Sequence, residues 1–230
     1  MIMESVTLLT RKRPEELLPF YRDVLELPVI DSAENRFTVQ TGYSSLTFLH
    51  QPEDAAQAPY YHFAINIPEN KLDEAKQWLE SRIELGTEDG SDISHSELWN
   101  SHSVYFLDPA GNILELIARH TMDNAVNRTF DPKQDLLGIS EMGLPTKDVP
   151  RAVDELEALG IPTYKRRDPV FNPVGDEEGI FIVVKPGRRW HFTNLTAACF
   201  SFQVNVKGIG PLTLEEGESG LVIRRESRWE

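Results

Sequence analysis

One feature constrains the fold of this chain more than any other, which is that the same order of expected elements occurs three times. A short apolar strand at residues 5–10 precedes a helical pattern from Pro14 and three short strands that end near residue 51. The pattern recurs from residue 60 and, more weakly, from residue 137. Such internal repetition predicts an α+β fold built from copies of one unit, a strand, a helix and three strands (βαβββ).

The repeats suggest a division of the chain into domains. Units at residues 5–52 and 58–119 form an expected first domain over residues 1–119. Residues 120–135 are polar and lack periodicity, which is typical of a linker. Residues 136–230 form a third, degenerate βαβββ-like unit, in which we expect residues 179–184 and 189–193 to pair as a hairpin.

The second unit contains the clearest hairpin, at residues 103–118. Strand-forming residues flank a turn that contains Pro109 and Gly111. The second strand of the hairpin is apolar except for Glu115, and a carboxylate is costly to bury without a donor or cation beside it. The sequence therefore predicts a partner for Glu115 inside the protein.

The best candidate partner is His62, which lies in the apolar strand that opens the second unit. Because side chains alternate along a strand, His62 and Glu115 can face each other from neighbouring strands. Imidazole nitrogen and carboxylate oxygen together suit zinc, manganese, iron, cobalt or nickel. A structural hydrogen bond between a buried His and a Glu is the alternative, and it is the commoner arrangement for such a pair.

Charge and composition limit the classes of partner. The chain has 230 residues, 40% of them hydrophobic, a net charge of −14 and a pI near 4.9. Nucleic acids and anionic membranes require a basic surface, so we expect neither as a partner. The single cysteine, Cys199, cannot form an internal disulfide, and residues 1–5 do not resemble a secretion signal. We therefore expect a cytoplasmic protein.

Several strings in the first two units resemble the vicinal oxygen chelate superfamily. They are FYRDVL at residues 20–25, YHFA at 61–64, and YFLDP at 105–109 followed by GNILEL at 111–116. This superfamily includes glyoxalase I, bleomycin-resistance proteins, fosfomycin-resistance thiol transferases and extradiol dioxygenases. The resemblance implies that two βαβββ units pair and that their mixed sheets curl around a cleft, often with a divalent metal.

The resemblance also implies where metal ligands lie. Ligands of the family come from the first and last strands of a unit, and His62 and Glu115 match these positions in the second unit. Val6 and Leu46 occupy the corresponding positions of the first unit and cannot bind a metal. We expect Fe, Mn, Zn or Ni at the site.

The third ligand is left open by the sequence. Glu4 and His50 alternate onto the expected cleft face, and His191 follows Gly187 by four residues, as Glu115 follows Gly111. It is also possible that none of these binds the metal. A third unit without a partner could pair with its copy in a homodimer or cap the cleft within the same chain.

The expected cleft is largely apolar and suits a small hydrophobic or aromatic molecule. Tyr105 is the candidate catalytic residue, as a proton or hydrogen-bond donor to a bound oxygen. The candidate pocket residues are Leu8, Thr10, Phe48, His50 and Asn66.

Two functions fit these residues. The first is a metal-dependent enzyme, either a lyase or isomerase or a ring-cleaving oxygenase, that acts on a small oxygenated molecule. The second is a metal-free binding protein of the bleomycin-resistance type. Glu115 beside His62 favours the enzyme, whereas Val6 and Leu46 favour the binding protein.

Overall fold

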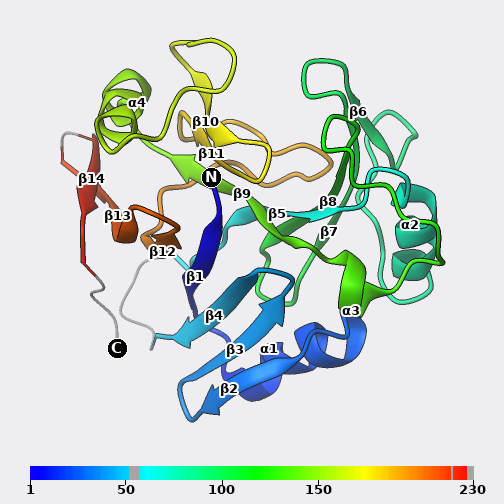
Figure 1. The fold of residues 1–230 in the computed structure, drawn as a ribbon. Helices are drawn as coiled ribbons and strands as arrows, with labels where there is room; N and C mark the ends of the chain where they lie inside the picture. Colours follow the sequence, from blue (N-terminus) through cyan, green and yellow to red (C-terminus); the bar gives the residue numbers. More distant parts are fainter. Residues whose placement is uncertain (52–56, 219, 227–230) are drawn as a thin grey trace.

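The computed structural model describes residues 1–51, 57–218 and 220–226. Two seven-stranded mixed sheets form the body of the fold, and short helices lie at its periphery (Figure 1). This architecture confirms the predicted α+β class with repeated units. Within the described residues, no helix has both the length and the apolar composition needed to cross a bilayer.

Sheet A has the strand order β14-β13-β12-β1-β4-β3-β2, and sheet B has the order β10-β11-β9-β5-β8-β7-β6. The strands of sheet A are β1 (Met3–Thr10), β2 (Val29–Ala33), β3 (Arg36–Thr41), β4 (Ser44–His50), β12 (Phe202–Val206), β13 (Gly210–Gly217) and β14 (Gly220–Arg224). The strands of sheet B are β5 (His62–Ile67), β6 (Ser94–Ser96), β7 (Ser101–Leu107), β8 (Ile113–Arg119), β9 (Gly138–Pro145), β10 (Phe171–Asp176) and β11 (Gly179–Val184). The helices are α1 (Pro14–Pro19), which runs into a π-helical turn η1 (Phe20–Val24), α2 (Leu72–Glu80), α3 (Pro132–Asp135) and α4 (Val149–Ala158).

The first two units form as predicted, but they do not share a sheet. Strand β1 pairs with β12, and β5 pairs antiparallel with β9. The prediction that the first two units pair around a cleft is therefore wrong. All residues of β5 are buried, whereas β1 alternates between buried and partly exposed residues. Because β5 is buried on both faces, it takes a central place in sheet B, with β8 and β9 at its edges.

The third unit also differs from the expectation. Strand β11 pairs with β10 and not with residues 189–193, which lie in an irregular segment over residues 185–201. Pro173 made β10 hard to recognise from sequence, because proline is rare inside strands. Strands β12 to β14 extend sheet A instead of completing the third unit. The division of the chain into domains on either side of residues 120–135 stays a prediction.

The core lies between the sheets, and a smaller apolar cluster lies on the other face of sheet B. The main core takes side chains from both sheets, including Phe48 of β4 and Phe63 of β5. The smaller cluster contains Tyr105, Ile182 and, from the irregular segment, Trp190. This second face of sheet B is therefore covered by residues 185–201, and the buried side chains of His62, Glu115 and Glu141 lie on it.

Gly42 ties the β3–β4 turn of sheet A to the start of β9. Its φ is +52°, and an added Cβ would lie 1.8 Å from the Leu137 carbonyl oxygen. We expect Gly42→Ala to lower the free energy of unfolding by about 3 kcal/mol, from the left-handed conformation and from displaced backbone. Gly111, with φ of +86° and open space around it, is the control, and Gly111→Ala should cost only about 1 kcal/mol. Urea unfolding of both variants measures this, and equal losses would contradict the steric argument.

Candidate metal centre

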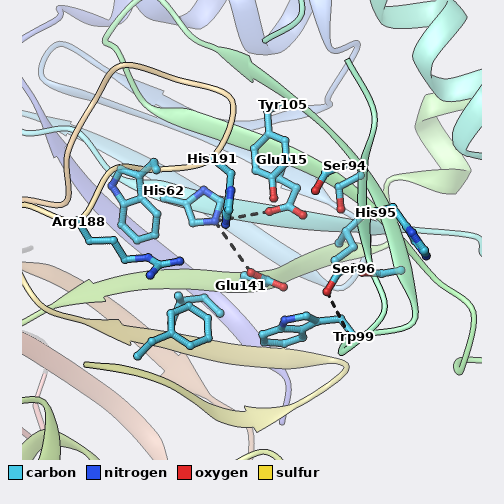
Figure 2. A pocket seen from close by; sticks show the side chains of 16 residues that line it. His62, Ser94, His95, Ser96, Trp99, Tyr105, Glu115, Glu141, Arg188 and His191 are labelled. Carbon is cyan, nitrogen blue, oxygen red and sulfur yellow. Dashed lines mark hydrogen bonds and ion pairs between the residues drawn. The ribbon is translucent and has the colours of Figure 1, made fainter. Parts of the chain in front are cut away.

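His62 begins β5 with its ring fixed in orientation. Its Nδ1 lies 3.2 Å from the carbonyl oxygen of Ile113, and a carbonyl can only accept, so Nδ1 carries the proton. The lone pair is thereby left on Nε2, which lies 3.5 Å from Oε2 of Glu115 and 4.0 Å from Oε2 of Glu141. Trp190 packs against the ring with centroids 4.7 Å apart. Figure 2 shows His62 directed at both carboxylates.

Ala64 explains why the two carboxylates meet. In the sheet register Ala64 lies opposite Glu115 of β8 on one side and opposite Glu141 of β9 on the other. His62 precedes Ala64 by two residues and shares its face. The methyl group of Ala64 leaves room for three longer side chains, and their ligand atoms all lie within 4.8 Å of one another.

Burial governs the protonation of the three groups. Desolvation raises the pKa of Glu115 above its ordinary value, and it raises the pKa of Glu141 to about 7, with the Glu115 charge adding to the shift. Desolvation lowers the pKa of His62, so its ring is neutral near pH 7. Two adjacent buried carboxylates and a neutral imidazole therefore form an electron-rich cluster that favours a cation.

Arg119 is the nearest buried cation. Its side chain is 0% exposed and its Nη2 donates to Oε1 of Glu141. Its Nε donates to Oδ1 of Asn66 at 3.3 Å, and its guanidinium lies over the Trp99 ring at 5.2 Å. Arg119 therefore holds one oxygen of Glu141 and leaves the other facing His62.

The donor set of His62, Glu115 and Glu141 fits a divalent metal. One imidazole lone pair and two carboxylates match the ligands that manganese, iron, zinc and nickel accept in proteins. Three protein ligands also leave coordination positions open to a substrate. A divalent cation would further relieve the repulsion between the two buried carboxylates.

The cluster lies in a cavity of about 280 Å³. Aromatic rings form much of its wall, and Figure 2 shows Tyr105 and Trp99 on either side of the carboxylates. Tyr105 is opposite Glu115 in the sheet, and burial, together with Glu115 and Glu141, raises the pKa of Tyr105 well above its ordinary value. Tyr105 therefore keeps its proton, and its hydroxyl hydrogen-bonds to Glu115. The remaining lining residues are Ser94, His95, Ser96, Ser101, Ser103, Ile117, Phe171, Ile182, Arg188 and His191, besides His62, Glu115, Glu141 and Trp190.

The structure brings some of the predicted site residues together. Tyr105, His62 and Glu115 converge, and His191 lines the cavity but has its Nδ1 3.7 Å from Glu88. Its side chain is 60% exposed, so His191 lies at the mouth of the cavity and not in the cluster.

Other predicted residues lie elsewhere, and none of them lines this cavity. Leu8 and Phe48 are buried in the main core, and Thr10 and His50 line a separate pocket. Asn66 is buried behind the cluster, where it binds Arg119. Glu4 accepts a hydrogen bond from Asn205 and is exposed. Their expected place at the cleft depends on the pairing of the first two units, which does not form.

Glu141 and Arg119 were not predicted as site residues. Glu141 interrupts the apolar strand β9, which is the first strand of the third unit, as β5 with His62 is the first strand of the second. The same signal that selected Glu115, a lone carboxylate in an apolar strand, was therefore present. Arg119 ends the fully buried strand β8 and carried a similar signal.

The raised pKa of Glu141 predicts how the stability of the metal-free protein depends on pH. Between pH 4.5 and about 7 the folded state binds a proton that the unfolded state has released, so the free energy of unfolding falls as pH rises. This group should contribute a loss on the order of 3 kcal/mol across that range. Urea unfolding at pH 5 and pH 8 with a chelator, compared with Glu141→Gln, measures it. The same pH dependence in both proteins would contradict the prediction.

Comparisons with known proteins bear on this fold. A family model described as toxoflavin-degrading enzyme matches residues 139–189. A proposed dioxygenase from Bacillus subtilis has a similar structure, with 17% identity and a TM-score of 0.59 over 80% of this chain and 63% of that chain. The chain has the vicinal oxygen chelate fold. The resemblance predicted from the sequence is thus confirmed.

Two further structures with smaller overlap were found. Lactoylglutathione lyase from Agrobacterium tumefaciens matches with 22% identity and a TM-score of 0.41, over 51% of this chain and 92% of that chain. A fosfomycin resistance protein from Listeria monocytogenes, complexed with Mn(II), matches with 15% identity and a TM-score of 0.40, over 53% of this chain and 91% of that chain. A comparison with curated proteins found no match. In this vicinal oxygen chelate fold, the cluster of His62, Glu115 and Glu141 lies where the second and third units meet in sheet B.

Proposed function

We propose that the protein is a metal-dependent enzyme that acts on a small aromatic or hydrophobic oxygenated molecule, as a lyase or isomerase or as a ring-cleaving oxygenase. His62, Glu115 and Glu141 hold the metal. The observation that carries this proposal is the convergence of the three ligand atoms within 4.8 Å at the wall of a cavity. The family match to a toxoflavin-degrading enzyme, which spans Glu141, is consistent with chemistry on a small molecule.

The cavity supports an aromatic substrate. Its rings, Trp99, Tyr105 and Trp190, line the cavity and can make edge or face contacts with a flat molecule. Hydroxyl groups of Ser101 and Ser103 lie in the same wall and can bind substrate oxygens. A flat molecule with oxygen atoms on one edge fits both kinds of surface.

Each side chain has a role in this proposal. A bound divalent metal would supply Lewis acidity towards the substrate oxygens or, if it is iron, activation of dioxygen. Tyr105 retains its proton and donates a hydrogen bond to a substrate oxygen that replaces its contact with Glu115. Arg119 fixes the orientation of Glu141, and Trp190 packs against the His62 ring and shields it from water.

Elemental analysis of protein purified without chelator tests the proposal. We expect near one metal per chain in the wild type and its loss in His62→Ala and Glu115→Gln, because each removes a ligand. Glu80→Gln, which removes an exposed carboxylate of α2, is the control and should retain the metal. Wild-type protein that takes up none of iron, manganese, zinc and nickel would contradict the proposal and leave a metal-free binding protein. A cytoplasmic location and a homodimer stay predictions.

A further inference from the structure

A second cavity of about 300 Å³ adjoins the cavity of the metal cluster. Trp99, Phe171 and Arg188 line both cavities, so the two spaces meet at these side chains. Figure 2 shows Trp99 and Arg188 on the Glu141 side of the first cavity. A molecule that occupies the first cavity can therefore extend past these residues into the second.

Cations gather around the second cavity in a chain that is strongly acidic. Lys165, Arg166 and Arg188 line it, and Asp168 is the one carboxylate among its lining residues. Oδ1 of Asp168 accepts the backbone N–H groups of Val170, at 2.9 Å, and Phe171, at 3.1 Å. One oxygen of the Asp168 carboxylate is therefore bound by its own loop, and three cationic side chains line the same cavity.

The two arginines lack carboxylate partners among the described residues. The contrast with Arg167 is direct, since that neighbour pairs with Asp154 and Glu157. The guanidinium of Arg188 is held over the Phe171 ring, 4.8 Å from its centroid. An unpaired guanidinium presents a planar set of donors that matches a carboxylate, sulfonate or phosphate.

Aromatic rings form the other side of this space. Trp99 stacks on Tyr164 with centroids 5.5 Å apart and planes 22° apart. The Nζ of Lys165 donates to the carbonyl oxygen of Leu98, which links the two segments that carry these rings. The second cavity thus combines a fixed aromatic wall with two arginines that pair with no carboxylate in the described part of the chain.

We propose that the second cavity is an anion subsite, which binds a carboxylate, sulfonate or phosphate group of an aromatic molecule whose ring lies near Trp99 and Phe171, where the two cavities meet. Arg166 and Arg188 contact the anion. That this molecule is a substrate, with its oxygen atoms at the metal cluster, rests on the proposed function. The anion recognition itself requires no metal.

A matched pair of probes tests the subsite. Isothermal titration calorimetry at pH 7.5 compares 2-naphthoate with naphthalene-2-carboxamide, which has the same shape and no charge. We expect the wild type to bind the carboxylate about tenfold tighter. Arg166→Gln and Arg188→Gln should each reduce that ratio, and the double variant should abolish it. Arg225→Gln removes an exposed arginine elsewhere and should leave the ratio unchanged.

Three outcomes would overturn the anion subsite. They are equal affinities of the wild type for the two probes, a preference that survives in the double variant, and a preference that appears only after Mn(II) is added. The last would indicate that the carboxylate binds the metal. The test also separates the two proposals. If the protein binds no metal and still prefers the carboxylate probe, the subsite is supported, whereas the metal-dependent enzyme is contradicted. Stoichiometric metal with equal probe affinities would do the reverse.

Discussion

Glu141→Gln is expected to abolish stoichiometric metal binding while the protein remains folded. The substitution keeps the size of the side chain and its hydrogen bond from Arg119, but it removes the negative charge and the oxygen lone pairs of a ligand. Loss of a residue that merely supports a ligand commonly costs 10- to 100-fold in metal affinity, so loss of a ligand should cost more than about 100-fold. Titration with Mn(II), followed by electron paramagnetic resonance of the free ion, measures the affinity.

Two controls make this result specific. Glu80→Gln removes an exposed carboxylate and should keep the affinity of the wild type. His191→Ala should also keep it, because His191 lies at the mouth of the cavity and interacts with Glu88. Loss of binding in His191→Ala together with full binding in Glu141→Gln would show that the third ligand is His191 instead.

Arg119→Met is expected to lower the free energy of unfolding of the metal-free protein by about 3–5 kcal/mol. Methionine fills a similar length, but the buried carboxylate of Glu141 then loses the cation that it contacts. Breaking a buried pair is costly because one group is left in the interior without compensation. Urea unfolding at pH 8, where Glu141 would be ionised, measures the loss.

A double variant tests whether the loss of stability in Arg119→Met comes from the broken pair of Arg119 and Glu141. In Arg119→Met/Glu141→Gln no charge is left unpaired, so part of the stability should return relative to Arg119→Met alone. Arg82→Met removes a partly exposed arginine that pairs with Glu26, and it should cost less than about 1 kcal/mol. A loss in Arg119→Met as small as that in Arg82→Met would contradict the role assigned to Arg119.

The sequence predicted local elements better than their partners. Alternation and turn residues act over a few positions. They were therefore enough to predict the hairpin of β7 and β8, the strand with His62 and the contact between His62 and Glu115. The choice of β9 as the second neighbour of β5 joins residues far apart in sequence. Several apolar strands competed for that edge, and nothing local to β5 distinguishes among them.

That missed pairing explains the errors at the site. With the first two units paired, Leu8 and Phe48 would have faced the cleft, whereas they lie in the core. With β9 beside β5, Glu141 enters the cluster and supplies the ligand that the first unit lacks. Arg119 was missed because its position next to Glu141 depends on the same pairing.

The order of pairing along the chain has a consequence for folding during synthesis. Sheet B uses strands between residues 62 and 184, whereas sheet A joins β1 to β12, whose pairing connects Leu8 with Phe202. On a ribosome, all strands of sheet B are available while β1 has β4 at one edge but still lacks β12 at the other. The sheet that carries the metal cluster can thus assemble first, and an apolar edge of the N-terminal strand stays exposed until β12 is synthesised.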